Sequence, residues 1–161
     1  MPDTYERLIV LLDRRQVLYQ VLDHAAEGRS DRIAVIRGNS PRQGAKAMVI
    51  QLRRGKRDRS HCLVVLPGDR RVDLARLSAA CEVRSASLAP AEVAEEMTGC
   101  VVGAIPPFSF SETLPLIVDP ALLENDEIVF NAGRLDRSIR LGTRAYVEVA
   151  APRIAPIAEV S

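Results

Sequence analysis

The chain has 161 residues, of which 47% are apolar and 27% charged, so it can bury a substantial core and is not typical of a disordered protein. Its 22 basic and 21 acidic residues give a net charge of +1, which neither requires nor excludes a nucleic-acid partner. No apolar run approaches the ~20 residues that span a bilayer, and the first six residues, MPDTYE, do not resemble a signal peptide. We therefore expect one cytoplasmic domain over residues 1–161.

The first third of the chain predicts two helices with a short strand between them. A capping-box pattern that starts at Asp3 precedes helically spaced apolar residues, which predicts a helix from Thr4 to Arg14. Residues 17–22 are expected to form a strand. A second helix follows, with Ser30 as its cap and Gly38 as its stop signal.

The middle of the chain predicts a hairpin, a helix and a return strand. The apolar runs over residues 45–52 and 62–66 indicate two buried strands, which a polar connection over residues 53–59 joins. Asp73 starts a helix that continues through Ala80. Residues 82–87 are then expected to form a strand.

The last third is less regular. A helix over residues 91–97 has Pro90 at its first turn and ends at Gly99. Strands are expected at residues 116–118, 128–130 and 138–141, and residues 143–150 fit either a helix or a strand. This irregular alternation lacks the βαβ period of a doubly wound fold, so it predicts an α/β protein of the mixed α+β type, a mixed sheet flanked by helices.

One polar segment, over residues 38–46, places a lysine at the start of an apolar strand. The ammonium of Lys46 must reach solvent, a carboxylate or an anionic ligand, because burying it alone is costly. The alternative is a lysine whose head group simply extends from the strand end into water.

Two further polar segments are candidates for a site. In residues 98–108 two glycines, Gly99 and Gly103, precede a proline pair, so backbone N–H groups can approach a ligand and hold a developing oxyanion. Residues 131–138 form a glycine-containing hairpin with polar residues at one end. The alternatives are a tight turn and an ordinary surface turn.

Known catalytic and metal-binding motifs are absent from the sequence. There is no GxSxG, P-loop, GxGxxG or HExxH pattern. The three cysteines, Cys62, Cys81 and Cys100, lack CxxC spacing and are expected to be single buried thiols. We expect His24 and His61 to be surface or core residues, and we predict neither a metal nor a cofactor.

The order and spacing of these segments resemble the YbaK/EbsC family, which is related to the editing domain inserted in bacterial prolyl-tRNA synthetase. The resemblance covers nearly the whole chain. It rests on the segments GAKA (44–47), VDL (72–74), TG (98–99), the GxxxP loop (103–107), LP (114–115), Asp119, NAG (131–133) and SIRL (138–141).

The resemblance implies a mixed or barrel-like sheet core ringed by helices, as in the prolyl-tRNA synthetase-associated domain. It also implies hydrolysis of the ester that joins an amino acid to the 3′ end of tRNA, without a metal. Lys46 and Gly103 take the catalytic positions. Further residues are expected to bind the substrate: Met48, Thr98, Gly99, Pro107, Phe108, Asn131, Ala132, Gly133, Arg134 and Ser138.

The resemblance leaves the choice of amino acid open. Certain relatives have histidine or lysine at the position of Arg134. The residues Arg37-Gly38 and Gly44-Ala45-Lys46 look more similar to members that act on seryl- or threonyl-tRNA than to alanyl- or cysteinyl-specific ones. A small amino acid is expected because a synthetase pocket distinguishes a missing methylene by only ~1–3 kcal/mol.

The expected partner is aminoacylated tRNA, and an aminoacyl-tRNA synthetase is a further candidate. We expect the protein to bind neither a membrane nor DNA. A cluster of cations in the hairpin connection is the candidate surface for tRNA phosphates: Arg53, Arg54, Lys56, Arg57 and Arg59. The alternative is a solvated hairpin tip. Two other functions remain open, a non-catalytic module that binds aminoacyl-tRNA or a synthetase complex, and a hydrolase of small aminoacyl esters or amides.

Overall fold

The computed structural model describes residues 3–160, so Met1, Pro2 and Ser161 of the expected domain lie outside the described residues. The helices are α1 (Thr4–Arg14), α2 (Ser30–Arg37), α3 (Leu74–Cys81), α4 (Ala91–Thr98) and α5 (Thr143–Ala150). The strands are β1 (Tyr19–Asp23), β2 (Ala45–Arg53), β3 (Arg59–Pro67), β4 (Ser85–Leu88), β5 (Leu116–Val118), β6 (Glu127–Arg134), β7 (Arg137–Gly142) and β8 (Arg153–Ile154). Short 3₁₀ turns cover Pro41–Gln43 and Leu122–Glu124. No helix within residues 3–160 has both the length and the apolar character needed to cross a membrane.

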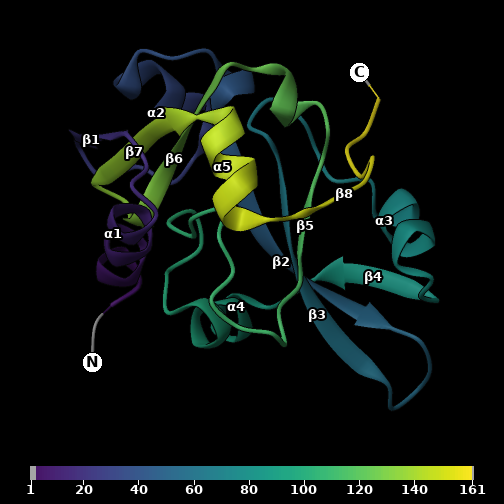
Figure 1. Ribbon diagram of the computed structural model, residues 1–161. Coiled ribbons are helices and arrows are strands. Elements are labelled where there is room, and N and C mark those ends of the chain that lie inside the picture. The colour runs from purple at the N-terminus through teal and green to yellow at the C-terminus, as the bar shows by residue number, and fades with distance from the viewer. Residues whose placement is uncertain (1–2, 161) are drawn as a thin grey trace.

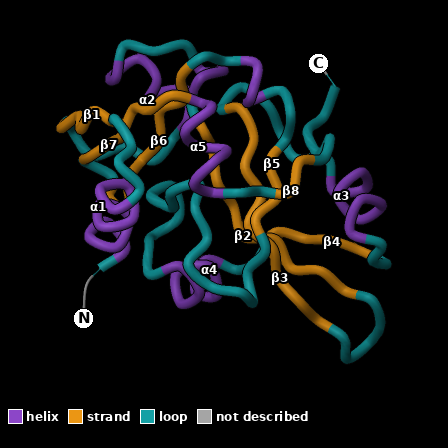
Figure 2. The backbone as a smooth tube through the Cα atoms, viewed as in Figure 1, coloured by secondary structure: helices purple, strands orange, loops and turns teal. Residues whose placement is uncertain are grey.

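The strands form two sheets (Figures 1 and 2). The smaller sheet is antiparallel with the order β1-β7-β6, and the larger has the order β4-β2-β3-β5-β8. Within the larger sheet β2 is antiparallel to β3 and β4, whereas β5 is parallel to β3 and β8. A single bridge between Gly44 and Val129 connects the two sheets. The predicted mixed sheet with flanking helices is therefore confirmed.

Two apolar clusters fill the interior, one on each face of β2 and β3. Alternate residues of these strands point to opposite faces, so Val49 belongs to one cluster and Ile50 to the other. The first cluster includes Phe108, Phe130 and the fully buried Tyr146 and lies toward the smaller sheet, α1 and α5. The second lies toward α3 and the C-terminal segment around residue 157.

Local capping signals placed most helix ends correctly. The side chain of Asp3 accepts a hydrogen bond from the backbone N–H of Glu6 at 2.8 Å, and Gly38 and Gly99 end their helices in the left-handed conformation. The expectation for Ser30 was wrong by one residue, because the N-cap of α2 is Arg29 and makes no side-chain cap bond. Pro90 likewise occupies the N-cap of α4.

Strand ends differ more from the prediction. Strand β1 starts two residues later than expected and β4 three residues later, since pairing with β7 and β2 sets their limits. The β2 and β3 pair runs from Ala45↔Pro67 to Arg53↔Arg59, which leaves a shorter turn than residues 53–59. Residues 143–150, ambiguous in the sequence, form α5.

A buried carboxylate ties the C-terminal segment to the larger sheet. Asp119 follows β5, and its Oδ2 accepts hydrogen bonds from the backbone N–H groups of Ile157 and Ala158, both at 2.8 Å. Its Oδ1 accepts from Ala121 N–H at 2.8 Å. Because three backbone donors satisfy this carboxylate, we assign Asp119 a structural role.

Candidate functional site

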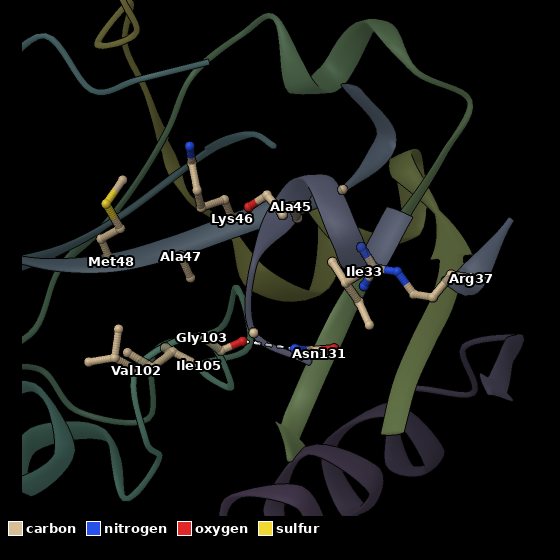
Figure 3. Close-up of a pocket in the computed structure, with 13 residues that line it drawn as sticks. Ile33, Arg37, Ala45, Lys46, Ala47, Met48, Val102, Gly103, Ile105 and Asn131 are labelled. Carbon is tan, nitrogen blue, oxygen red and sulfur yellow. Dashed lines mark hydrogen bonds between the residues drawn. The ribbon is translucent and has the colours of Figure 1, made fainter. Parts of the chain in front are cut away.

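A cavity of about 190 Å³ opens where the two sheets meet, between the start of β2 and the loop that follows α4 (Figure 3). This size is below the range of about 300–1,000 Å³ typical of sites for drug-sized molecules, so the cavity suits a smaller group. The residues that line it come from four separate segments of the chain: Gly28, Ser30, Ile33, Arg37, Gly44, Ala45, Lys46, Ala47, Met48, Val102, Gly103, Ile105 and Asn131.

The lining restricts the chemistry that the cavity can perform. Among the residues that line it, none is Asp, Glu, His or Cys. Carboxylate, imidazole and thiol groups are thus missing from its wall. The wall offers two cations, Lys46 and Arg37, the hydroxyl of Ser30, one amide and several backbone groups, which suits a reaction driven by positioning and by electrostatic stabilisation.

Lys46 lies at the mouth of the cavity. In Figure 3 its side chain and that of Met48 project to one side of β2, whereas Ala47 projects to the other side, toward Gly103. The Lys46 ammonium donates a hydrogen bond to the backbone carbonyl of Arg70. Its pKa is lowered by burial and by the nearby charge of Arg71, against the opposing effect of Asp69.

Arg37, at the end of α2, directs its guanidinium to the floor of the cavity (Figure 3). Its Nε donates to Asn39 Oδ1 at 3.1 Å and its Nη1 to Ser138 Oγ at 3.2 Å. Among the described residues Arg37 is in no ion pair, and burial, followed by the charge of Arg140, lowers its pKa to about 10. An anionic or strongly polar ligand would relieve this cost.

A buried hydrogen-bond network fixes two walls of the cavity relative to each other. The Nδ2 of Asn131 donates to the carbonyls of Glu27 at 2.9 Å and Gly103 at 2.8 Å. Its Oδ1 accepts from the hydroxyl of Ser138 at 3.0 Å. The Nε2 of His24 lies 2.7 Å from the same hydroxyl. Asn131 therefore orients the loop that carries Gly103, and Ser138 orients Asn131.

Gly103 occupies a position that only glycine tolerates. Its φ is +93°, and a Cβ added there would lie 2.9 Å from the Cα of Gly28. Its carbonyl is held by Asn131. Within residues 3–160 no hydrogen-bond acceptor is found for its N–H, so this donor is available to a ligand.

Of the residues predicted from the sequence, Lys46, Met48, Gly103 and Asn131 line this cavity, and Ser138 lies beneath it. Three others, Thr98, Gly99 and Phe108, line a different cavity beside the N-terminus of α1.

The remaining predicted residues support the site or lie away from it. The carbonyl of Pro107 accepts a 2.7 Å hydrogen bond from the buried hydroxyl of Tyr146. Ala132 is buried in the core, and a Cβ on Gly133 would lie 3.1 Å from the backbone of Tyr5. Arg134 is exposed and pairs with Asp136, with 2.9 Å between Nε and Oδ1.

The five predicted tRNA-contacting cations are all exposed, at the far end of the β2–β3 hairpin. That hairpin projects from the body of the protein in Figure 1. Eight residues of strand separate Lys46 from Arg54, a distance of about 26 Å. Two further cations, Arg70 and Arg71, lie much closer, in the loop whose backbone contacts Lys46.

Sequence reasoning missed Arg37 and His24 as parts of the site. Each lacks a surrounding motif, and each meets Ser138 only through folding, across 101 and 114 residues of chain. Among residues 3–160 no group of three His, Cys, Asp or Glu side chains is placed to hold a metal ion. Cys62 and Cys100 are buried free thiols, as predicted, whereas the free thiol of Cys81 is only half-buried.

Comparison with known proteins gives three kinds of match. The profile of the aminoacyl-tRNA editing domain matches residues 24–149. The multifunctional Ser/Thr-tRNA deacylase ProXp-y of Escherichia coli K12 is 45% identical over 153 residues, which cover 94% of this chain and 90% of that protein.

Solved structures share the fold. A crystal structure of a hypothetical protein aligns with a TM-score of 0.86 and 23% identity, over 96% of this chain and all of the other. A proposed trans-editing enzyme for prolyl tRNA synthetase aligns with a TM-score of 0.81 and 21% identity, over 99% of both chains.

Proposed function

The chain belongs to the aminoacyl-tRNA editing domain family, and we propose that it is a trans-editing deacylase that hydrolyses tRNA mischarged with a small amino acid. Serine and threonine are the first candidates, because the relative from Escherichia coli is named for them, and alanine and cysteine follow. The observation that carries the proposal is a small cavity whose wall has cations and the free N–H of Gly103, and has no carboxylate, imidazole or thiol side chain.

This wall suits an aminoacyl ester in particular. Such an ester is already activated, so its hydrolysis needs a positioned water and stabilisation of the oxyanion rather than a protein nucleophile. The N–H of Gly103 is the donor to the ester carbonyl. A hydroxyl of the terminal ribose orients the attacking water, because the cavity wall has no carboxylate or imidazole for that role.

Lys46 would bind the phosphate at the 3′ end of the tRNA. Its ammonium lies at the mouth of the cavity, on the face of β2 opposite to Gly103, which favours contact with the tRNA backbone over contact with the ester carbonyl. The charges of Arg70 and Arg71 would add to the attraction. The apolar side chains of Ile33, Ala47 and Ile105 then limit the size of the amino acid.

The experiment is deacylation of tRNAs charged with Ser, Thr, Ala, Cys or Pro, by the wild type and by Lys46→Ala. The matched control is Arg14→Ala, since this exposed cation at the end of α1 lies outside both the cavity and the β2–β3 hairpin. We expect Ser or Thr to be released well above the spontaneous rate, with loss of that acceleration in K46A and not in R14A. No acceleration with any of the five would refute the proposed reaction.

We also propose that the β2–β3 hairpin contacts tRNA phosphates and not bases, because no aromatic residue lies among its cations. The double variant Arg54→Ala/Arg57→Ala should reduce the slope of log K against log salt by about 1.4–1.8. Replacing Arg14, exposed at the end of α1, is the control. An unchanged slope in the double variant would leave the hairpin as a solvated tip.

A synthetase as docking partner is a further proposal, which co-purification would test.

A further inference from the structure

Backbone groups form part of the cavity wall that β2 provides, beside the side chain of Ala47. Five consecutive residues, Gly44 to Met48, line the cavity. Side chains of a strand alternate between its two faces, and Figure 3 shows those of Lys46 and Met48 on one side and Ala47 on the other. The feature that all five share is the edge of the strand, which carries its N–H and C=O groups.

Hydrogen bonds along β2 show which backbone groups face this edge. The carbonyl of Val49 accepts from Ala89 N–H at 3.0 Å, on the side of β4. The carbonyl of Gly44 accepts from Gly68 N–H at 2.9 Å, on the side of β3. Because backbone groups alternate along a strand, the N–H and C=O of Ala47 point to the same side as those of Val49.

That side of the strand is open at Ala47. Strand β4 ends at Leu88, which pairs with Ile50, and the next strand contact of β2 is the bridge between Gly44 and Val129 of β6, so no strand pairs with Ala47 on this side. Within the described part of the chain, neither the N–H nor the C=O of Ala47 has a hydrogen-bond partner. Both groups are therefore free to bind a ligand in the cavity.

We propose that Ala47 binds the aminoacyl group as if it were one residue of an added antiparallel strand. An aminoacyl ester carries an α-ammonium and a carbonyl in the same relation as the N–H and C=O of a peptide residue. The C=O of Ala47 accepts a hydrogen bond from the α-ammonium, and its N–H donates to the ester carbonyl oxygen. This inference rests on the proposed deacylase function and deepens it.

Two consequences follow for the reaction. The carbonyl oxygen receives donors from opposite walls, Ala47 N–H from β2 and Gly103 N–H from the facing loop, which is the arrangement of an oxyanion hole. The substrate also has to carry a free α-amine. Esters whose amine is missing or acylated lose a charge-assisted hydrogen bond, which corresponds to about a 10- to 100-fold loss of rate.

The first test uses the wild-type protein and two esters of the same tRNA, seryl and 3-hydroxypropanoyl, which is the seryl group without its α-amine. Each rate is divided by the spontaneous rate of the same ester, because the amine itself activates the ester. We expect the acceleration to be about 10- to 100-fold smaller for 3-hydroxypropanoyl-tRNA. Equal acceleration would overturn the pairing and leave the deacylase function intact. No acceleration of seryl-tRNA or of any other charged tRNA would overturn both.

The second test removes the donor at Ala47. Ala47→Pro deletes an N–H that faces the open edge and leaves the β3 ladder intact, a position where a strand tolerates proline. In A47P we expect kcat for seryl-tRNA to fall about 10- to 100-fold with little change in KM. The control Ala47→Gly keeps the N–H, and its kcat should be at least about ten times that of A47P. Circular dichroism and thermal unfolding show whether A47P is folded. Wild-type kcat in folded A47P would overturn the proposal, and if A47P does not fold, the 3-hydroxypropanoyl ester decides.

Discussion

The hydroxyl of Ser138 offers a direct test of the network beneath the cavity. Its side chain is fully buried, donates to Asn131 and is contacted by Arg37 and His24. Ser138→Ala removes the hydrogen bonds with Asn131 and His24, each worth about 1 kcal/mol, and one from the charged donor Arg37, worth about 1.5–3 kcal/mol. Since Arg37 is partly open to water in the cavity, we expect a loss of about 2–4 kcal/mol in the free energy of unfolding.

Thermal and urea unfolding measure this loss. For a chain of this length it corresponds to a decrease in Tm of roughly 4–16 °C. The matched control is Ser78→Ala in α3, whose half-buried hydroxyl makes a single bond to the carbonyl of Leu74 at 2.8 Å and should cost about 1 kcal/mol or less. We also expect kcat for deacylation to fall about ten-fold in S138A, because Asn131 loses the partner that orients it toward Gly103. A loss of stability in S138A no greater than that in S78A would refute the network's role.

Three other variants test the loop and the hairpin. Gly103→Ala should lower the free energy of unfolding in urea by roughly 2 kcal/mol or more and the deacylation rate at least ten-fold. The reason is the φ of +93° at Gly103 and the 2.9 Å from its added Cβ to the facing backbone of Gly28. The control Gly55→Ala, with open space around it, should change neither quantity. Tyr146→Phe removes the 2.7 Å hydrogen bond to Pro107 and should lower stability by about 1–2 kcal/mol in thermal unfolding, with a smaller effect on kcat. Arg134→Ala should leave the ratio of kcat/KM for seryl-tRNA to kcat/KM for threonyl-tRNA unchanged, since the exposed Arg134 side chain pairs with Asp136 outside the cavity. A changed ratio would show that Arg134 contributes to amino-acid specificity.

Local sequence signals were sufficient to predict the ends of the helices but not the ends of the strands. A cap such as Asp3 or a stop such as Gly99 acts through bonds within a few residues, so the sequence shows it directly. Where a strand starts depends on its partner. The two residues of β8 pair with β5 and have no pattern of their own, and β1 starts only where β7 can pair with it.

The candidate site shows the same difference between residues that local sequence signals predict and residues that only tertiary contacts reveal. Lys46, Gly103 and Asn131 belong to segments whose composition is unusual for packing, so they were found from the sequence, and folding places them around one cavity. Arg37 entered the sequence analysis only through the pair Arg37-Gly38 and the choice of amino acid, and it was not placed among the site residues. Its place in the site follows from the tertiary contact with Ser138 and from its position in the cavity wall.

The position of the cavity explains how a fold without a catalytic side chain can support hydrolysis. An unpaired strand edge is normally a liability, because its free N–H and C=O groups attract other strands. Here β2 extends past the end of β4, and α2 and the Gly103 loop flank the uncovered edge, so only a small group can reach it. The edge then serves as a rigid set of donors and acceptors that requires little reorganisation during the reaction. Catalysis should therefore depend on the residues that hold the walls together, Asn131 and Ser138, as well as on the cation of Lys46.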